Sequence, residues 1–187
     1  MAKRFFDLSL SLVFLVLFSL PMVVIAALIK LMSPGPAVFW TDRVGVNNRI
    51  FKMAKFRTMK VGTPQIASHL MNNPGHYLIP GGRFLRKYSL DELPQLINVL
   101  KGEMSFVGPR PALFNQSDLI EFRTEKNVHT VIPGVTGWAQ VNGRDELPIP
   151  VKVDFDAYYC LHRSFLFDLR ILLMTVRKVL NKEGIAH

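Results

Sequence analysis

The sequence predicts a mainly helical α+β protein in which an N-terminal membrane helix precedes a domain with a short β-hairpin. Three features lead to this fold class: an uncharged apolar run over residues 8–29, two short alternating segments around residues 45–48, and an amphipathic pattern over residues 153–180. The break Ser33-Pro34-Gly35-Pro36 separates the membrane helix, residues 1–32, from the remaining domain, residues 33–187. The second segment is long enough for one hydrophobic core.

The composition favours a membrane partner over nucleic acid. Lys and Arg number 23 against 14 Asp and Glu, and the net charge of +9 suits nucleic acid, anionic lipid or phosphorylated substrates. The hydrophobic content of 49% is high for a soluble basic protein, and the sequence has no zinc-finger, RNA-binding or basic-zipper motif. Cys160 is the single cysteine, expected as a buried thiol, so the chain forms no internal disulfide, which fits a reducing compartment.

The N-terminal run predicts a helix that is long enough to cross a bilayer. Residues 8–29 carry no charge, and a run of roughly 22 residues spans the hydrocarbon layer. Pro21 lies inside this run and predicts a kink, and the Ser19 hydroxyl can bond a carbonyl that the proline leaves free. Basic residues flank both ends, so charge gives no orientation, and a kinked span and a hairpin-like helix stay open as alternatives.

Two strands are expected next, over Ala37–Val44 and Arg49–Thr58, joined through residues 45–48. In the second strand, Lys55 and Arg57 share a face and point toward one site in this prediction, with a solvated strand face as the alternative. The following residues, 59–82, predict a loop with one short helix near residues 65–71.

The segment Tyr88–Pro111 is the centre of the predicted site. Ser89 and Glu92 have the spacing of a capping box, which predicts a helix that starts at Ser89 and ends at Gly102. The apolar face of this helix is expected to consist of Leu93, Leu96, Ile97 and Leu100. Asp91 and Glu92 then lie together in the first turn.

Two interpretations of this acidic pair are open. Carboxylates in a first helical turn are ordinary, because they complement the helix dipole. However, nearby basic residues complete a set suited to phosphoryl transfer, with a carboxylate nucleophile, a carboxylate for a divalent cation and cations for phosphate oxygens. These basic residues are Arg83, Arg86, Lys87 and Arg110.

The remaining segments predict two helical regions and one glycine-punctuated loop. Residues 112–128 and 153–180 are expected to be helical, and the second has an apolar stripe with basic flanks, which suits either a membrane surface or core packing. In the loop at 132–144, the glycines are expected to let the backbone approach a ligand. In this loop, Thr136 and Gln140 offer hydrogen bonds, and the guanidinium of Arg144 offers two parallel N–H donors for a phosphate. Trp138 is expected to pack inward or lie at the membrane interface.

Three motifs make the chain resemble a known family. The motif SLDELPQLINVLKGEMSFVGPRP, with KFRTM before it and PGVTGWAQVNGR after it, closely resembles the bacterial sugar transferases, which are monotopic phosphoglycosyl transferases that load polyprenol phosphate. The resemblance covers nearly the whole chain. It implies a re-entrant N-terminal helix and interfacial amphipathic helices around a cytoplasmic active site at the bacterial inner membrane. Family members often carry Trp-Glu at the positions of Ile149 and Pro150 here, and a serine directly before the proline where this chain has Leu20.

The resemblance also implies the reaction and the role of each residue. A UDP-sugar would give its phospho-sugar to polyprenol (undecaprenyl) phosphate and release UMP, with Asp91 as the nucleophile and Glu92 as the Mg²⁺ ligand beside it. Metal contact is expected for both acids. The residues expected at the substrate phosphates are Lys55, Arg86, Arg110, Thr136, Gly137, Gln140 and Arg144. The expected partners are a UDP-sugar, polyprenol phosphate, membrane lipids and a second copy of the chain, with no nucleic acid.

Two alternatives belong to other functional classes. In the first, the protein is a catalytically inert membrane adaptor whose acids only start a helix. In the second, it is a nucleotide-sugar diphosphate hydrolase that uses water instead of lipid phosphate. The identity of the sugar does not follow from the sequence.

Overall fold

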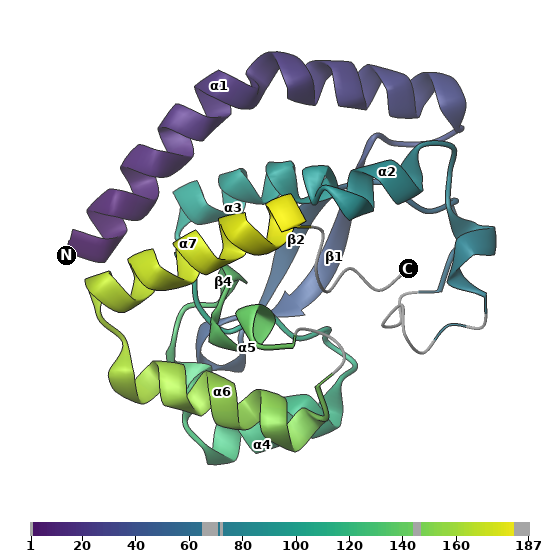
Figure 1. Ribbon diagram of the computed structural model, residues 1–187. Helices are drawn as coiled ribbons and strands as arrows, with labels where there is room; N and C mark the ends of the chain where they lie inside the picture. The colour runs from purple at the N-terminus through teal and green to yellow at the C-terminus, as the bar shows by residue number, and fades with distance from the viewer. Residues whose placement is uncertain (1, 65–70, 72, 144–146, 182–187) are drawn as a thin grey trace.

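The computed structural model describes residues 2–64, 71, 73–143 and 147–181 and has a mainly helical α+β fold, as predicted (Figure 1). The α-helices are α1 (Ala2–Met32), α2 (Gly82–Lys87), α3 (Leu96–Lys101), α4 (Ser117–Glu125), α5 (Trp138–Val141), α6 (Ile149–His162) and α7 (Phe165–Asn181). The strands are β1 (Val38–Val44), β2 (Ile50–Phe56), β3 (Ser105–Val107) and β4 (Gly134–Thr136). Short 3₁₀-helices are η1 (Val46–Asn48), η3 (Pro74–Tyr77), η4 (Leu90–Gln95) and η5 (Val128–Thr130).

Two small sheets organise the domain. Strands β1 and β2 form the predicted antiparallel hairpin, in which Lys55 lies opposite Phe39. Strands β3 and β4 form a parallel pair that the sequence did not indicate, with Val107 opposite Thr136. Strands of three residues are too short to display the alternation by which a strand is recognised in a sequence.

Helix α1 arches over the domain and contacts it at both ends (Figure 1). At the amino end, Arg4 donates to the carbonyls of Val99 and Leu100, at distances of 2.6 and 2.7 Å. At the carboxyl end, Ile29 is buried in a cluster with the side chains of Phe56, Ile79 and Leu85. Both ends of this apolar helix are therefore held by the same domain.

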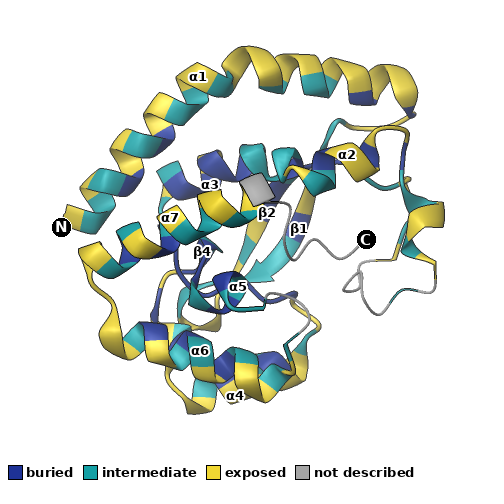
Figure 2. Ribbon diagram, viewed as in Figure 1, coloured by how far each residue is buried: buried dark blue, intermediate teal, exposed yellow. Residues whose placement is uncertain are grey.

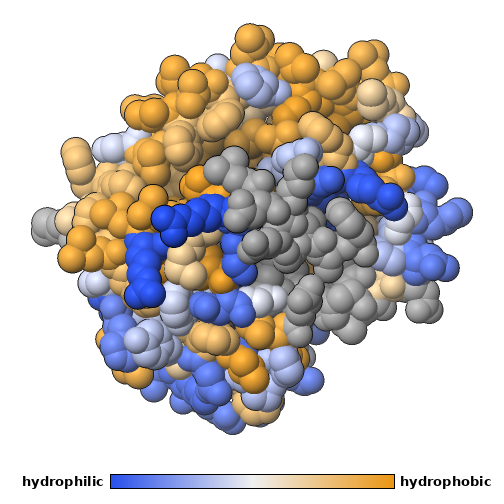
Figure 3. Space-filling view, in the orientation of Figure 1, coloured by the Kyte–Doolittle hydropathy of each residue, from blue (hydrophilic) through white to orange (hydrophobic). Residues whose placement is uncertain are grey.

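The middle of α1 presents apolar side chains to the outside. Leu12, Val16 and Leu20 are 60–72% exposed, and the apolar surface gathers along α1 at the top of the molecule (Figures 2 and 3). The helix continues through Pro21 and is visibly bent in Figure 1. The Ser19 hydroxyl donates to the carbonyl of Val16 at 2.8 Å, one residue before the carbonyl that Pro21 leaves without its helical partner.

The predicted capping box at Ser89 is wrong. Ser89 has a φ of 54° in the left-handed region and makes no capping bond, and η4 precedes α3 as a separate 3₁₀-helix. Pro94 explains the division, because it has no N–H for an α-helical bond and the chain winds into α3 only after it. The buried face also differs, since Ile97 is 37% exposed, whereas the completely buried members of α3 are Asn98 and Val99. The helix ends before Gly102, as predicted.

The C-terminal region forms two helices, α6 and α7, where the sequence predicted one. Ser164 lies between them, and its hydroxyl accepts the N–H of Phe167 at 3.2 Å, which is an N-cap for α7. Within α7, Ile171 is fully buried while Leu166 and Leu173 are 77% and 64% exposed, so the helix has a core face and an exposed apolar face. The helix predicted over 112–128 is shorter, as α4, and the one predicted at 65–71 lies almost wholly outside the described residues.

Candidate active site

The acidic pair lies on η4, between the hairpin and the β3–α4 connection. Asp91 is 7% exposed, so its carboxylate is nearly removed from water. The left-handed turn at Ser89 starts η4, and the Glu92 N–H donates to the Ser89 carbonyl at 3.1 Å. The backbone geometry that carries both acids is therefore a tight 3₁₀ turn.

Two cations from distant segments converge on Glu92. Lys55 Nζ lies 2.7 Å from Glu92 Oε1, and Arg110 Nη2 lies 3.2 Å from the same oxygen. The side chains of Lys55 and Glu92 are only 15% and 11% exposed, which strengthens their attraction relative to a surface pair. The structure thus brings together Lys55, Glu92 and Arg110.

The electrostatics of the site come from burial opposed by these charges. Burial raises the pKa of Asp91, and Glu92 adds to the rise, whereas Lys55, Arg86 and Arg110 lower it. Burial likewise lowers the pKa of Lys55, and Glu92 and Asp91 oppose that change. Arg86 is therefore one of the three cations that lower the pKa of Asp91.

Asn98 joins the two elements of the site and was not singled out from the sequence. Its Oδ1 accepts the N–H of Ala54 at 3.0 Å, and its Nδ2 donates to the Lys52 carbonyl and to Glu103 Oε2, each at 2.7 Å. Strand β2, which carries Lys55, is thus bound to the helix that follows Glu92. A polar residue inside the buried stripe of a helix is the sequence signal that points to such a role.

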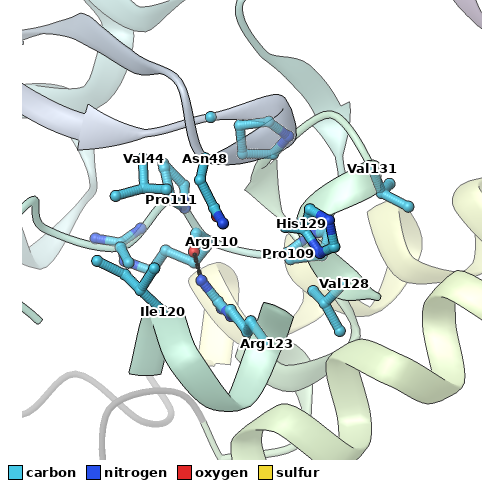
Figure 4. A pocket seen from close by; sticks show the side chains of 13 residues that line it. Val44, Asn48, Pro109, Arg110, Pro111, Ile120, Arg123, Val128, His129 and Val131 are labelled. Carbon is cyan, nitrogen blue, oxygen red and sulfur yellow. Dashed lines mark hydrogen bonds between the residues drawn. The ribbon is translucent and has the colours of Figure 1, made fainter. Parts of the chain in front are cut away.

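The backbone around Arg110 borders a small pocket (Figure 4). Pro109 and Pro111 flank Arg110, and the Arg123 side chain points at the Arg110 carbonyl from α4. The pocket lies between η1, the Pro109–Pro111 segment and the region from α4 to η5. Its polar lining includes Asn48, Arg110, Arg123 and His129.

Arg57 does not join the site, although it was predicted to share one with Lys55. Its guanidinium is 4% exposed and donates to the hydroxyl and carbonyl of Ser33 at 3.0 and 2.9 Å, and to the Pro36 carbonyl at 2.6 Å. Arg57 therefore ties the exit of α1 to the end of β2. Its side chain supplies hydrogen-bond donors to the backbone carbonyls at both ends of the Ser33–Pro36 turn.

The glycine-punctuated segment packs closely against the protein. A Cβ atom at Gly134 would lie 2.1 Å from the Gly108 nitrogen, and one at Gly137 would lie 2.1 Å from the Gly108 oxygen. The two glycines thus allow close approach of the chain to Gly108, whereas their contact with a ligand stays a prediction.

The side chains that were singled out in the segment 132–144 have different surroundings in the structure. The Thr136 hydroxyl is paired with that of Thr175 at 2.7 Å, so it faces α7. Both amide atoms of Gln140 are buried without a hydrogen-bond partner among the described residues. Trp138 packs inward against Tyr158 and Phe167, with Arg170 over its ring, and Arg144 lies outside the described residues.

The donor set fits a Mg²⁺ ion only when substrate supplies further ligands. Among the described residues, no group of three or more His, Cys, Asp or Glu side chains could hold a metal. Asp91 and Glu92 provide two adjacent carboxylates, and Mg²⁺ is commonly held by one or two carboxylates together with substrate phosphates. The residues present therefore fit a metal that arrives with a diphosphate.

Comparison with known proteins places the chain in a family. The family model for the bacterial sugar transferases matches residues 1–182. The chain is 42% identical over 185 residues to the uncharacterized sugar transferase EpsL of Bacillus subtilis, covering 98% of this chain and 89% of EpsL.

Other relatives carry a named activity. The chain is 40% identical to the Escherichia coli UDP-glucose:undecaprenyl-phosphate glucose-1-phosphate transferase, across 94% of this chain and 39% of that protein. It is 38% identical to the Aeromonas hydrophila UDP-N-acetylgalactosamine-undecaprenyl-phosphate N-acetylgalactosaminephosphotransferase, across 97% of this chain and 44% of that protein. The chain therefore spans less than half the length of these two relatives. It belongs to the bacterial sugar transferase family.

Proposed function

We propose that this protein transfers a phospho-sugar from a UDP-sugar to polyprenol (undecaprenyl) phosphate and releases UMP. The observation that carries the proposal is the nearly buried Asp91 beside Glu92, with Lys55, Arg86 and Arg110 acting on the pair. The names of the relatives support undecaprenyl phosphate as the acceptor and a UDP-sugar as the donor. The product would start a glycoconjugate at the membrane, such as an O-antigen, a capsule, an exopolysaccharide or a glycoprotein glycan.

In the first step, a carboxylate oxygen of Asp91 attacks the phosphorus that bears the sugar. A bond forms from Asp91 to this phosphorus, the bond from the phosphorus to the UMP oxygen breaks, and UMP leaves with the electron pair. In the second step, an oxygen of polyprenol phosphate attacks the same phosphorus, and Asp91 departs as a carboxylate. The products are a polyprenol diphosphate sugar and the regenerated enzyme.

The cations around Asp91 make this attack on an anion feasible. Arg86, Arg110 and Lys55 lie where they reduce the repulsion between the carboxylate and the substrate phosphates. Glu92 holds Lys55 and Arg110 in place through one carboxylate oxygen. A Mg²⁺ ion, when bound by the acids and the diphosphate, supplies further charge neutralisation.

The attachment of α1 supports a re-entrant helix. A helix of 31 residues extends about 46 Å if straight, enough to cross a bilayer. Its ends, at Arg4 and Ile29, both pack on the one domain, which could not lie on two sides of a membrane. We propose that residues 1–32 lie in the cytoplasmic leaflet of the bacterial inner membrane and residues 33–187 on its cytoplasmic face. The exposed apolar face of α7 would lie at the membrane surface.

Trapping the intermediate tests the proposal. Purified protein in detergent is incubated with radiolabelled UDP-sugars and no lipid, and both protein-bound label and UMP release are measured. A transferase acquires one label and stops, an adaptor retains none, and a hydrolase releases sugar phosphate steadily.

Two variants identify the nucleophile. Asp91→Asn should abolish the label, while Asp154→Asn, at a carboxylate that is 63% exposed, should keep it. Full turnover in the Asp91→Asn variant would exclude Asp91 as the nucleophile. A screen over UDP-sugars for UMP release identifies the donor, and light scattering tests the predicted homodimer.

A further inference from the structure

The backbone that carries Arg110 is held at three consecutive carbonyls by three different elements. The Pro109 carbonyl accepts the N–H of Gly134 at 2.9 Å, and the Pro111 carbonyl accepts Nη1 of Arg43 at 3.2 Å. The carbonyl between them, that of Arg110, accepts Nη1 of Arg123 at 2.7 Å. Both prolines lack an N–H, so in this segment the carbonyls are the main groups through which the protein can fix the backbone.

Arg123 is itself fixed by a buried carboxylate. Its Nε and Nη2 lie 3.0 and 2.5 Å from Asp156 Oδ2 on α6, and the two residues are 8% and 1% exposed. Burial raises the pKa of Asp156, and Arg123 opposes this rise. Because the removal of two charges from water is costly, an apolar pair of similar size would often be as stable. Packing alone therefore gives little reason for this ion pair.

We infer that Arg123, held by Asp156, is a positioning residue that acts through Arg110. The planar guanidinium uses one edge for Asp156 and its remaining nitrogen for the Arg110 carbonyl, a bridge that only a fork of several donors can make. This bridge fixes the backbone from which the Arg110 side chain reaches Glu92, at 3.2 Å. The inference rests on the proposed function, because Arg110 is expected to contact the substrate phosphates.

The same two helices provide a matched control. Lys126, the residue that follows α4, forms an ion pair with Asp154 of α6, and their side chains are 47% and 63% exposed. This pair links the same elements as Arg123 and Asp156, but it lies at the surface and not against the Arg110 carbonyl. Its removal tests whether any loss of charge between α4 and α6 lowers activity.

A double-mutant cycle tests the inference. The paired substitution Arg123→Met with Asp156→Leu removes both buried charges together, and Lys126→Ala with Asp154→Ala is the control. We expect the first to lower kcat/KM for UMP release by about 100-fold, as for a misplaced substrate contact, and the control to change it by less than about twofold. In an Arg110→Ala background, the first substitution should have almost no further effect, because the contact it supports is already gone.

The outcomes separate this inference from the proposed function. Equal losses with and without Arg110 would show a merely structural role for Arg123 and overturn the inference, as would an unchanged kcat/KM in the paired variant. If the paired variant unfolds, Arg123→Lys replaces it, since lysine keeps the charge but cannot bridge both groups, and the same cycle applies. If the wild-type protein releases no UMP from any UDP-sugar, the proposed function fails.

Discussion

Lys55 Nζ lies 2.7 Å from Glu92 Oε1, although 37 residues separate the two in the sequence. The contact joins strand β2 to the 3₁₀-helix η4 and closes the candidate site on one side. Arg110 shares the same oxygen of Glu92, so the carboxylate holds two cations beside Asp91.

Loss of Lys55 should disable the site without unfolding the protein. Lys55→Met leaves Glu92 with Arg110 and removes one cation near Asp91, so kcat/KM for UMP release should fall by about 100-fold. The matched control is Lys52→Met, on the same strand, whose ammonium pairs with Asp42 and is 66% exposed. The control should retain activity within about twofold. Equal losses in both variants would mean that charge on β2 in general, and not the Glu92 contact, supports the reaction.

The pH dependence of kcat/KM should be bell-shaped. Asp91 must be ionised to attack, and its pKa is raised by burial, so activity should rise with pH through a value above the 3.8 of an ordinary aspartate. The pKa of Lys55 is lowered by burial, so its charge and the activity should be lost as pH rises through a value below 10.5. In the Lys55→Met variant, the acidic limb should move to higher pH, since a cation that stabilises ionised Asp91 is gone. An acidic limb unchanged in that variant would contradict the assigned coupling.

Asn98 should support both stability and activity. Asn98→Leu leaves the Ala54 N–H and the Lys52 carbonyl without their partner, which costs about 1–3 kcal/mol for each unpaired group. Thermal unfolding measures the loss, and UMP release at a temperature where the variant is folded measures the effect on Lys55. The control is Asn142→Ala, because the Asn142 side chain donates to a carbonyl of its own helical turn, that of Trp138. Full activity in folded Asn98→Leu would limit Asn98 to a structural role.

The glycines opposite Gly108 should tolerate no side chain. Gly134→Ala and Gly137→Ala would each place a Cβ 2.1 Å from backbone atoms of Gly108, so β4 must separate from the β3 connection. The free energy of unfolding should fall by about 3 kcal/mol or more. Gly75→Ala is the control, since among the described residues its Cβ would meet the end of Arg83, at 3.8 Å. Near-native thermal stability of Gly134→Ala would contradict this packing.

Local patterns in the sequence were sufficient for the N-terminal helix and the hairpin, but not for the parallel pair of β3 and β4. The length of the uncharged run predicted α1, and the alternating segments predicted the hairpin, because one face of a strand is buried at every second residue. The acidic pair with its basic neighbours indicated phosphoryl chemistry. Two predicted helices are each divided in the structure, one at Pro94 and one at Ser164. Periodicity did not show these divisions, because a single residue can end a helix without disturbing the apolar pattern.

Only the tertiary structure decided which side chains act together. Lys55 and Arg57 were predicted on one face of one strand, yet Lys55 pairs with Glu92, while Arg57 follows the end of β2 and binds the exit of α1. Arg123 and Asn98 reach the site only through backbone groups of other segments. Sequence periodicity reports which face of an element is buried, but it carries no information about the partner on that face. The partner depends on how elements that are far apart in the chain pack together. That packing is determined jointly by all the contacts of the hydrophobic core.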